Sequence, residues 1–126
     1  MSSLFRLIPF VMVVVLVLVV CGGCQRSEPV APSRMHLVLG ALQIPDEVER
    51  ETELVSACLQ CAIVGDAESV LIGIPSIDDE NLRHDVAKDC VPMLIAANRK
   101  EAAKKVVELI TDPAKRDELS GTLTTN

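Results

Sequence analysis

The chain contains almost no aromatic residues. Its 126 residues include no Trp and no Tyr, and its two Phe, Phe5 and Phe10, both lie close to the N-terminus. Any folded core must therefore be built from Leu, Ile, Val, Ala, Met and Cys, a set that suits closely packed helices. The sequence also provides no aromatic platform on which nucleic-acid bases or sugar rings could stack.

Basic residues are outnumbered as well. The chain has 12 Lys and Arg against 18 Asp and Glu, a formal net charge of -6, and no Lys and Arg cluster that could follow a phosphate backbone. We therefore expect no nucleic-acid partner. Glycine-rich phosphate loops and the nucleophile elbow of hydrolases are missing too. The sequence predicts a protein that is not an enzyme and that carries no cofactor and no metal.

Hydrophobic residues are abundant in one place, the N-terminus. Arg6 is followed by an almost entirely aliphatic stretch over residues 7–20, which has the charged start and apolar centre of a secretory signal peptide. The uncharged run over residues 7–24 is 18 residues long, slightly shorter than the roughly 20 that a membrane-spanning helix needs. We expect a cleaved signal, and an uncleaved membrane anchor remains the alternative.

The hydrophobic run ends in Cys21-Gly22-Gly23-Cys24, which is followed by a polar, proline-containing tether. This segment resembles the lipobox of bacterial lipoproteins, in which small residues precede a cysteine that becomes the acylated first residue of the mature chain. The resemblance implies lipidation of Cys24. Modification of Cys21 fits less well, because Val20 would occupy a position that requires a small side chain. Residues 1–23 are thus a signal peptide or membrane anchor, and residues 24–33 a flexible tether.

A short pattern is written three times at one fixed interval. It consists of an Ile, an Asp two positions later and an Arg four positions after that: Ile44, Asp46 and Arg50; Ile77, Asp79 and Arg83; Ile110, Asp112 and Arg116. A period of about 33 residues falls in the range that is typical of stacked helical units. Each Asp is well placed as the N-cap of a helix. Each Arg could pair with its Asp or reach the carbonyl end of the preceding helix.

Apolar residues at helical spacing extend the same period. They predict helices near residues 34–44, 46–64, 66–74, 79–97, 99–110 and 112–120. The first long helix is expected to bury Val48 with Leu54, and to end at Gly65. Pro75 should end its short helix early, and Pro92 should kink the second long helix.

This arrangement resembles the tetratricopeptide-like class of α-helical hairpin repeats over residues 34–123. The resemblance implies an all-α fold, a short right-handed stack of about two and a half units, and a role in protein–protein interaction. So short a stack barely reaches the minimum of about three units that such arrays need. Formation of a homodimer or docking on a partner would cover an exposed end.

The remaining residues with potential chemistry are cysteines and histidines. Cys58 and Cys61 have redox spacing but fall in the middle of a predicted helix, on its buried side, so core packing is expected. A disulfide from Cys58 or Cys61 to Cys90 is a second hypothesis, because the compartment outside the inner membrane is oxidising. His36 and His84 are expected on solvated helix faces.

Together these features predict a small exported lipoprotein in the bacterial cell envelope. Its helical domain would lie outside the cytoplasm and bind a protein partner, and its acylated N-terminus would hold it on the lipid bilayer. The alternative is an uncleaved single-pass membrane protein whose helical domain is a structural or regulatory appendage.

Overall fold

The computed structural model describes residues 32–125, and the expected signal peptide at residues 1–23 and most of the tether lie outside them. Within this part of the chain all regular structure is helical, as the sequence predicted. The α-helices are α2 (Met35–Leu42), α3 (Glu47–Ile63), α4 (Ala67–Gly73), α5 (Glu80–Ala96), α6 (Lys100–Glu108) and α7 (Pro113–Thr124), with a 3-10 turn η1 (Ile74–Ser76) between α4 and α5.

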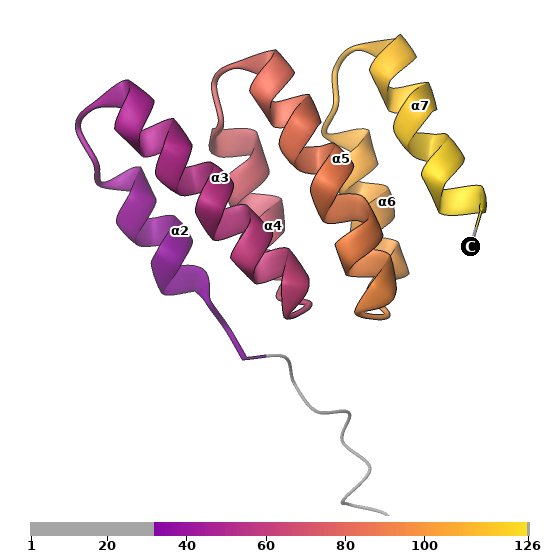
Figure 1. Cartoon of the computed structure of the whole chain (residues 1–126), viewed down its shortest axis with the longest axis horizontal. Coiled ribbons are helices and arrows are strands. Elements are labelled where there is room, and N and C mark those ends of the chain that lie inside the picture. Colours follow the sequence, from indigo (N-terminus) through magenta and orange to yellow (C-terminus); the bar gives the residue numbers. More distant parts are fainter. Residues whose placement is uncertain (1–31, 126) are drawn as a thin grey trace, which may run out of the picture. The chain divides into compact units, whose positions relative to one another are not determined.

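The helices form two layers (Figure 1). Helices α3, α5 and α7 lie side by side and form the long-helix layer, and α2, α4 and α6 form the short-helix layer behind it. The chain alternates between the two layers. At one edge it passes through the turns that precede α3, α5 and α7, and at the opposite edge through the turns that precede α4 and α6.

The turns before α3, α5 and α7 are built by the same hydrogen bonds. In each, the Asp carboxylate accepts from backbone amides in the first turn of the helix, which confirms the predicted N-caps. The distances are 2.9 Å from Glu49 N to Asp46 Oδ1, 2.9 Å from Leu82 N to Asp79 Oδ1, and 2.9 and 3.3 Å from Ala114 N and Lys115 N to Asp112 Oδ1.

The Arg of the pattern closes the same turns from the other side. Each guanidinium donates to the carbonyl of the Ile that ends the preceding segment: Arg50 Nη1 to Ile44 O at 3.3 Å, Arg83 Nη2 to Ile77 O at 2.7 Å, and Arg116 Nε to Ile110 O at 2.8 Å. Of the two roles that the sequence allowed for these arginines, the structure therefore shows the contact with the carbonyl end. Cap and guanidinium together satisfy backbone groups that would otherwise lack partners.

The turns at the other edge also match each other. Gly65 after α3 has φ 75° and Asn98 after α5 has φ 62°, the left-handed conformation that commonly ends helices. The amide of the next residue then reaches back five positions, from Asp66 N to Cys61 O at 2.9 Å and from Arg99 N to Leu94 O at 2.7 Å. Gly65 was predicted as a helix end, and Asn98 is its counterpart one period later.

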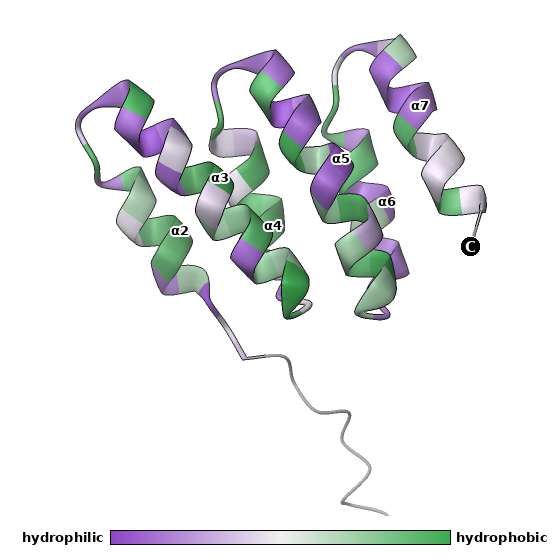
Figure 2. Ribbon diagram, in the orientation of Figure 1, coloured by the Kyte–Doolittle hydropathy of each residue, from purple (hydrophilic) through white to green (hydrophobic). Residues whose placement is uncertain are grey.

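The core lies between the two layers and is aliphatic, as the missing aromatic residues require. Its largest fully buried side chains are Leu54, Ile74, Ile77, Leu94, Ile110 and Leu119. Figure 2 shows hydrophobic and hydrophilic residues alternating along the helices, and hydrophilic residues at the turns that precede α3, α5 and α7. One expected core residue was wrong: Val48 is 75% exposed, because it lies in the first turn of α3 at a place that is also exposed in α5 and α7, where Asn81 and Ala114 are its counterparts.

The two prolines have different effects. Pro75 lies in η1, where α4 gives way to a 3-10 turn, so the predicted early end of this short helix is confirmed. Pro92 lies inside α5, which continues on both sides of it from Glu80 to Ala96. Its side chain is exposed, so the missing amide hydrogen bond falls on the solvent side of the helix, where water can replace it.

Candidate functional site

Cys24, the predicted lipidation site, and Cys21 lie outside the described residues. The structure therefore leaves this prediction untested. Among residues 32–125 no helix is both long and apolar enough to cross a membrane.

The other three cysteines gather at the centre of the domain. Cys58 and Cys61 on α3 and Cys90 on α5 are fully buried, and all three are free thiols in this structure. The Cys61 Sγ lies 3.8 Å from the carbonyl of Arg34 and can donate a weak hydrogen bond to it. Cys58, Cys61 and Cys90 therefore pack as small core residues here, and disulfide formation between the helices remains a hypothesis.

Their surroundings disfavour the thiolate form. Burial, reinforced by the neighbouring cysteines, raises the pKa of Cys58 and of Cys90 to about 12. Burial also raises the pKa of Cys61, with the nearby Asp66 carboxylate acting in the same direction. A thiol that remains protonated at neutral pH is a poor nucleophile and a poor metal ligand. Among the described residues no group of His, Cys, Asp and Glu side chains is arranged to hold a metal ion.

A buried carboxylate joins the start of α2 to the start of α4. Asp66 is 7% exposed, and its Oδ2 accepts from the amide of Arg34 and from the Ser69 hydroxyl, both at 2.6 Å, while its Oδ1 accepts from Ser69 N at 3.3 Å. Burial alone would raise the pKa of this carboxyl, but the bonds from Ser69 and Arg34 outweigh burial and lower it. The sequence predicted Asp66 as a cap of α4 and gave no sign of its bond to Arg34.

His84 is placed differently from the expectation of a solvated face. It is 8% exposed and lies where α5 meets α7, with its Nε2 3.7 Å from Glu118 Oε2 and its Nδ1 3.8 Å from Asp85 Oδ1. The Nε2 atom is buried without a hydrogen bond. Lys88 Nζ donates to Glu118 Oε1 at 3.0 Å, and this bond lowers the pKa of Glu118. His36, in contrast, is exposed as predicted.

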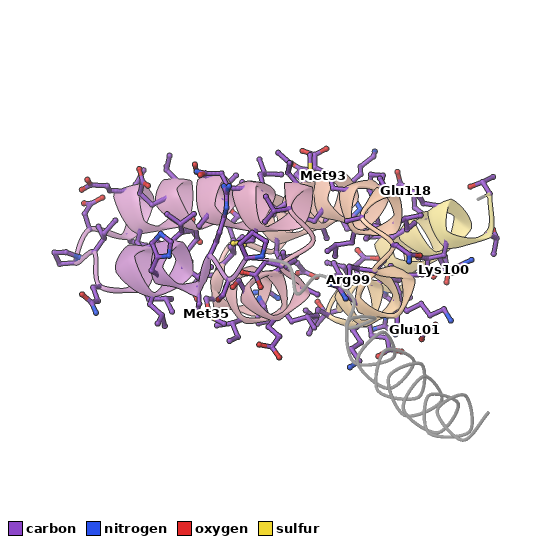
Figure 3. All side chains as sticks on the ribbon, turned by 90° about the horizontal axis from the view of Figure 1, so that it is seen from below. Met35, Met93, Arg99, Lys100, Glu101 and Glu118 are labelled. Carbon is purple, nitrogen blue, oxygen red and sulfur yellow. The ribbon has the colours of Figure 1, made fainter. Side chains whose placement is uncertain are left out.

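The outer surfaces of the two layers differ in chemistry. Figure 3 shows Met93 and Glu118 on the side of the long helices, and Met35 and Glu101 on the side of the short helices. The exposed residues of the long-helix layer include Glu47, Glu49, Glu53, Asp85, Asp89 and Glu118, together with the apolar Val48 and Ile63 on α3 at 75% and 64%. The short-helix layer exposes Leu39, Leu42 and Ile72 at 49%, 38% and 44%, and its last helix, α6, carries three lysines beside the exposed Glu101 and Glu108.

Comparisons with known proteins give no further assignment. No family model, no curated protein and no solved structure matches this chain. Its function has to be argued from its own residues.

Proposed function

We propose that this chain is a small exported lipoprotein, anchored in the bacterial cell envelope through Cys24, whose helical domain serves as a protein–protein interaction module. Two features support the anchor: the apolar stretch over residues 7–20 and the small residues that precede Cys24. The observation that carries the module is the repetition of one turn, with the same Asp cap and the same Arg contact, once in every period of the sequence.

Such a repetition is the signature of a stack of helical hairpins. Every unit contacts only its neighbours, and the stack offers long continuous faces for binding. The two layers, the period and the paired turns at both edges suit about two and a half tetratricopeptide-like units. The architecture supports a binding role but does not identify the partner, because binding faces of this kind serve many different partners.

The first unit has the features of a stack end. Three positions are covered or partly covered in α5 and exposed in α3, because α5 has a long helix before it and α3 has none. In α5 they are Leu82, Val86 and Met93, and in α3 they are Glu49, Glu53 and Gln60. The polar replacements fit solvent, as terminal repeats require. They favour a monomer over the homodimer that so short a stack suggested.

The last unit ends in the same way. Cys58 and Val91 are buried in α3 and α5, and their counterpart in α7 is the exposed Thr124. Glu51 of α3 and His84 of α5 occupy one place in the repeat, and each contacts the next long helix or the turn before it. The residue at this place in α7 is Asp117, which is exposed. With both ends polar, the faces that remain for a partner are the outer surfaces of the two layers.

The long-helix layer is the surface that we assign to the protein partner. The charged side chains exposed around Ser56, Asp89 and Glu118 are mostly acidic, so a partner with basic groups on its surface would be complementary to this layer. A photoreactive residue at Ser56 should cross-link an envelope protein in cells. The matched position Lys105 on the short-helix layer should not give that product.

The anchor is tested by the mass of the N-terminal peptide isolated from bacterial membranes. A peptide that begins at Cys24 and carries acyl mass, lost in Cys24→Ala and retained in Cys21→Ala, is the expected result. The alternative, an uncleaved single-pass protein, draws support from the 18 uncharged residues at positions 7–24. A chain that still begins near Met1 in the unsubstituted protein and in both variants would establish that alternative.

A further inference from the structure

Helix α2 is unusual because it carries no charged side chain and still lies at the surface. Its sequence is MHLVLGAL, with Leu39 and Leu42 49% and 38% exposed and Met35 and Leu37 half-buried. A surface helix normally places charged residues on its outer face. The apolar outer face of α2 therefore calls for a covering surface.

The apolar surface continues onto α4, the neighbour of α2 in the short-helix layer. Ile72, one period after Leu39, occupies the matching place on α4 and is 44% exposed. On α6 the same place holds Lys105, which is exposed beside Lys104, and Lys100 lies one turn earlier. The short-helix layer thus presents an apolar area on α2 and α4 next to a lysine-bearing area on α6.

Two observations indicate what covers this surface. Ten residues, 25–34, separate Cys24 from α2. Even fully extended they reach only about 35 Å, so a chain anchored at Cys24 keeps the start of α2 within about that distance of the bilayer. The charges of the two layers also differ. The long-helix layer exposes an excess of carboxylates, which an anionic leaflet repels. On the short-helix layer the three lysines of α6 offset the exposed Glu68, Glu101 and Glu108, so its apolar side chains can approach a membrane interface without a net negative charge around them.

We propose that the outer face of the short-helix layer lies on the membrane surface, with Leu39, Leu42 and Ile72 at the headgroup boundary and Lys100, Lys104 and Lys105 against anionic lipid headgroups. This inference rests on the proposed membrane anchor. It orients the domain so that the long-helix layer points away from the bilayer and remains free for a protein partner.

The test uses the full chain, processed in bacteria and reconstituted into vesicles of phosphatidylcholine with or without phosphatidylglycerol. A polarity-sensitive fluorophore is attached at Leu39→Cys or Ile72→Cys on the short-helix layer, or at Ser56→Cys on the long-helix layer as the matched control. The buried native thiols stay protonated at neutral pH, and the unsubstituted chain measures any background labelling. Lipids that carry a nitroxide on the headgroup quench the fluorophore on contact.

Quenching at positions 39 and 72, and its absence at position 56, is the expected result in vesicles that contain phosphatidylglycerol. Replacing Lys100, Lys104 and Lys105 by Gln should weaken the surface-bound state roughly fivefold per lysine. Lys88→Gln on the other layer should leave the quenching unchanged. Equal quenching at positions 39 and 56 in chains that float with the vesicles would overturn the inference and assign the apolar face to a protein or a second copy. Chains that fail to float would overturn the proposed anchor itself, a separate outcome.

Discussion

Gly73 on α4 lies directly against Cys58 on α3. A Cβ atom added to Gly73 would stand 2.5 Å from Cys58 Sγ and 3.5 Å from the nearest methyl group of Val38. The absence of a side chain at Gly73 is what lets the short helix approach the long helix so closely. The contact also joins two residues that no short-range pattern in the sequence connects.

The first prediction follows from this contact. Gly73→Ala should lower the free energy of unfolding of the domain by about 1–3 kcal/mol, the usual effect of overpacking a core. Cys58→Ala removes the sulfur atom that the new methyl group meets, so the double variant should lose less stability than the two single variants added together.

Gly40→Ala is the matched control. It occupies the same place in α2 with nothing within 4 Å of the added Cβ, and it should raise the stability by roughly 0.5–1 kcal/mol. Urea denaturation of these four variants and of the unsubstituted chain measures the differences, and strict additivity would contradict the contact.

The second prediction concerns the turns before α4 and α6. Gly65→Ala forces an L side chain into φ 75° and brings its Cβ to 3.0 Å from Ala97 Cβ, so we expect a loss of more than about 1 kcal/mol. Asn98→Gly at the equivalent turn should change stability by about 0.5 kcal/mol or less, because both residues adopt this conformation readily. If Asn98→Gly lost as much stability as Gly65→Ala, the two turns would not be equivalent.

The third prediction concerns the pH dependence of stability at Asp66. Its pKa is lower in the folded chain than in the unfolded chain, so its contribution is fully present above the ordinary carboxyl pKa of 3.8 and is lost as the pH falls through the folded-state pKa. Asp66→Ala should lower the free energy of unfolding by about 1–2 kcal/mol at neutral pH. Asp66→Asn keeps one acceptor oxygen, so we expect a smaller loss at neutral pH. In both variants, the fall in stability as the pH drops below 3.8 should be smaller than in the unsubstituted chain. An unchanged acid profile in both variants would contradict the network.

The fourth prediction concerns alkaline pH. The folded-state pKa of Cys58 and of Cys90 is about 12, against an ordinary value of 9.0. Between these values the unfolded chain releases thiol protons that the folded chain keeps, so stability should fall as the pH rises above 9.0. Replacing both cysteines by Ala should reduce this fall, although the cavities cost stability at every pH. Native chains should also react slowly with a thiol reagent at neutral pH and rapidly in denaturant.

The fifth prediction tests the ends of the stack. The substitutions Glu49→Leu, Glu53→Val and Gln60→Met place the α5 residues at the equivalent positions of α3. They should convert the polar end of the stack into an apolar surface through which chains self-associate. We expect a concentration-dependent increase in sedimentation coefficient for a fragment of residues 32–126. The control variant Thr52→Leu with Ser56→Leu adds apolar surface to exposed positions of α3 outside these three places and should remain monomeric. Association of the unsubstituted fragment would instead support the homodimer.

Local features of the fold could be predicted from the sequence, and features that depend on neighbouring helices could not. The Asp caps were predictable because the capping carboxylate, the helix start and the donor amide lie within four residues. The expected burial of Val48 and the expected exposure of His84 were both wrong. Val48 lies at a place that is exposed in all three long helices, with Asn81 and Ala114 as its counterparts. His84 is covered by α7, a contact that spans about one period of the chain.

The sequence predicted that these thiols are buried, but their reactivity depends on how completely they are buried. From their spacing alone, Cys58 and Cys61 could have had a packing, redox or disulfide role. Their complete burial raises their pKa values, an effect that exists only once α3 and α5 have packed together. Helix ends were predicted to within a few residues, and α7 extends to Thr124, beyond the expected residue 120, because Leu119 and Leu123 pack against the core.

The bond between the Arg34 amide and the Asp66 carboxylate also has a mechanical consequence. It joins the first residue of the helical domain to a residue 32 positions later, at the start of a helix in the middle of the short-helix layer. A force applied to the chain ahead of Arg34 would therefore load α4 through this bond as well as α2 through its own packing. In the proposed anchored protein, α2 and α4 would share such a load.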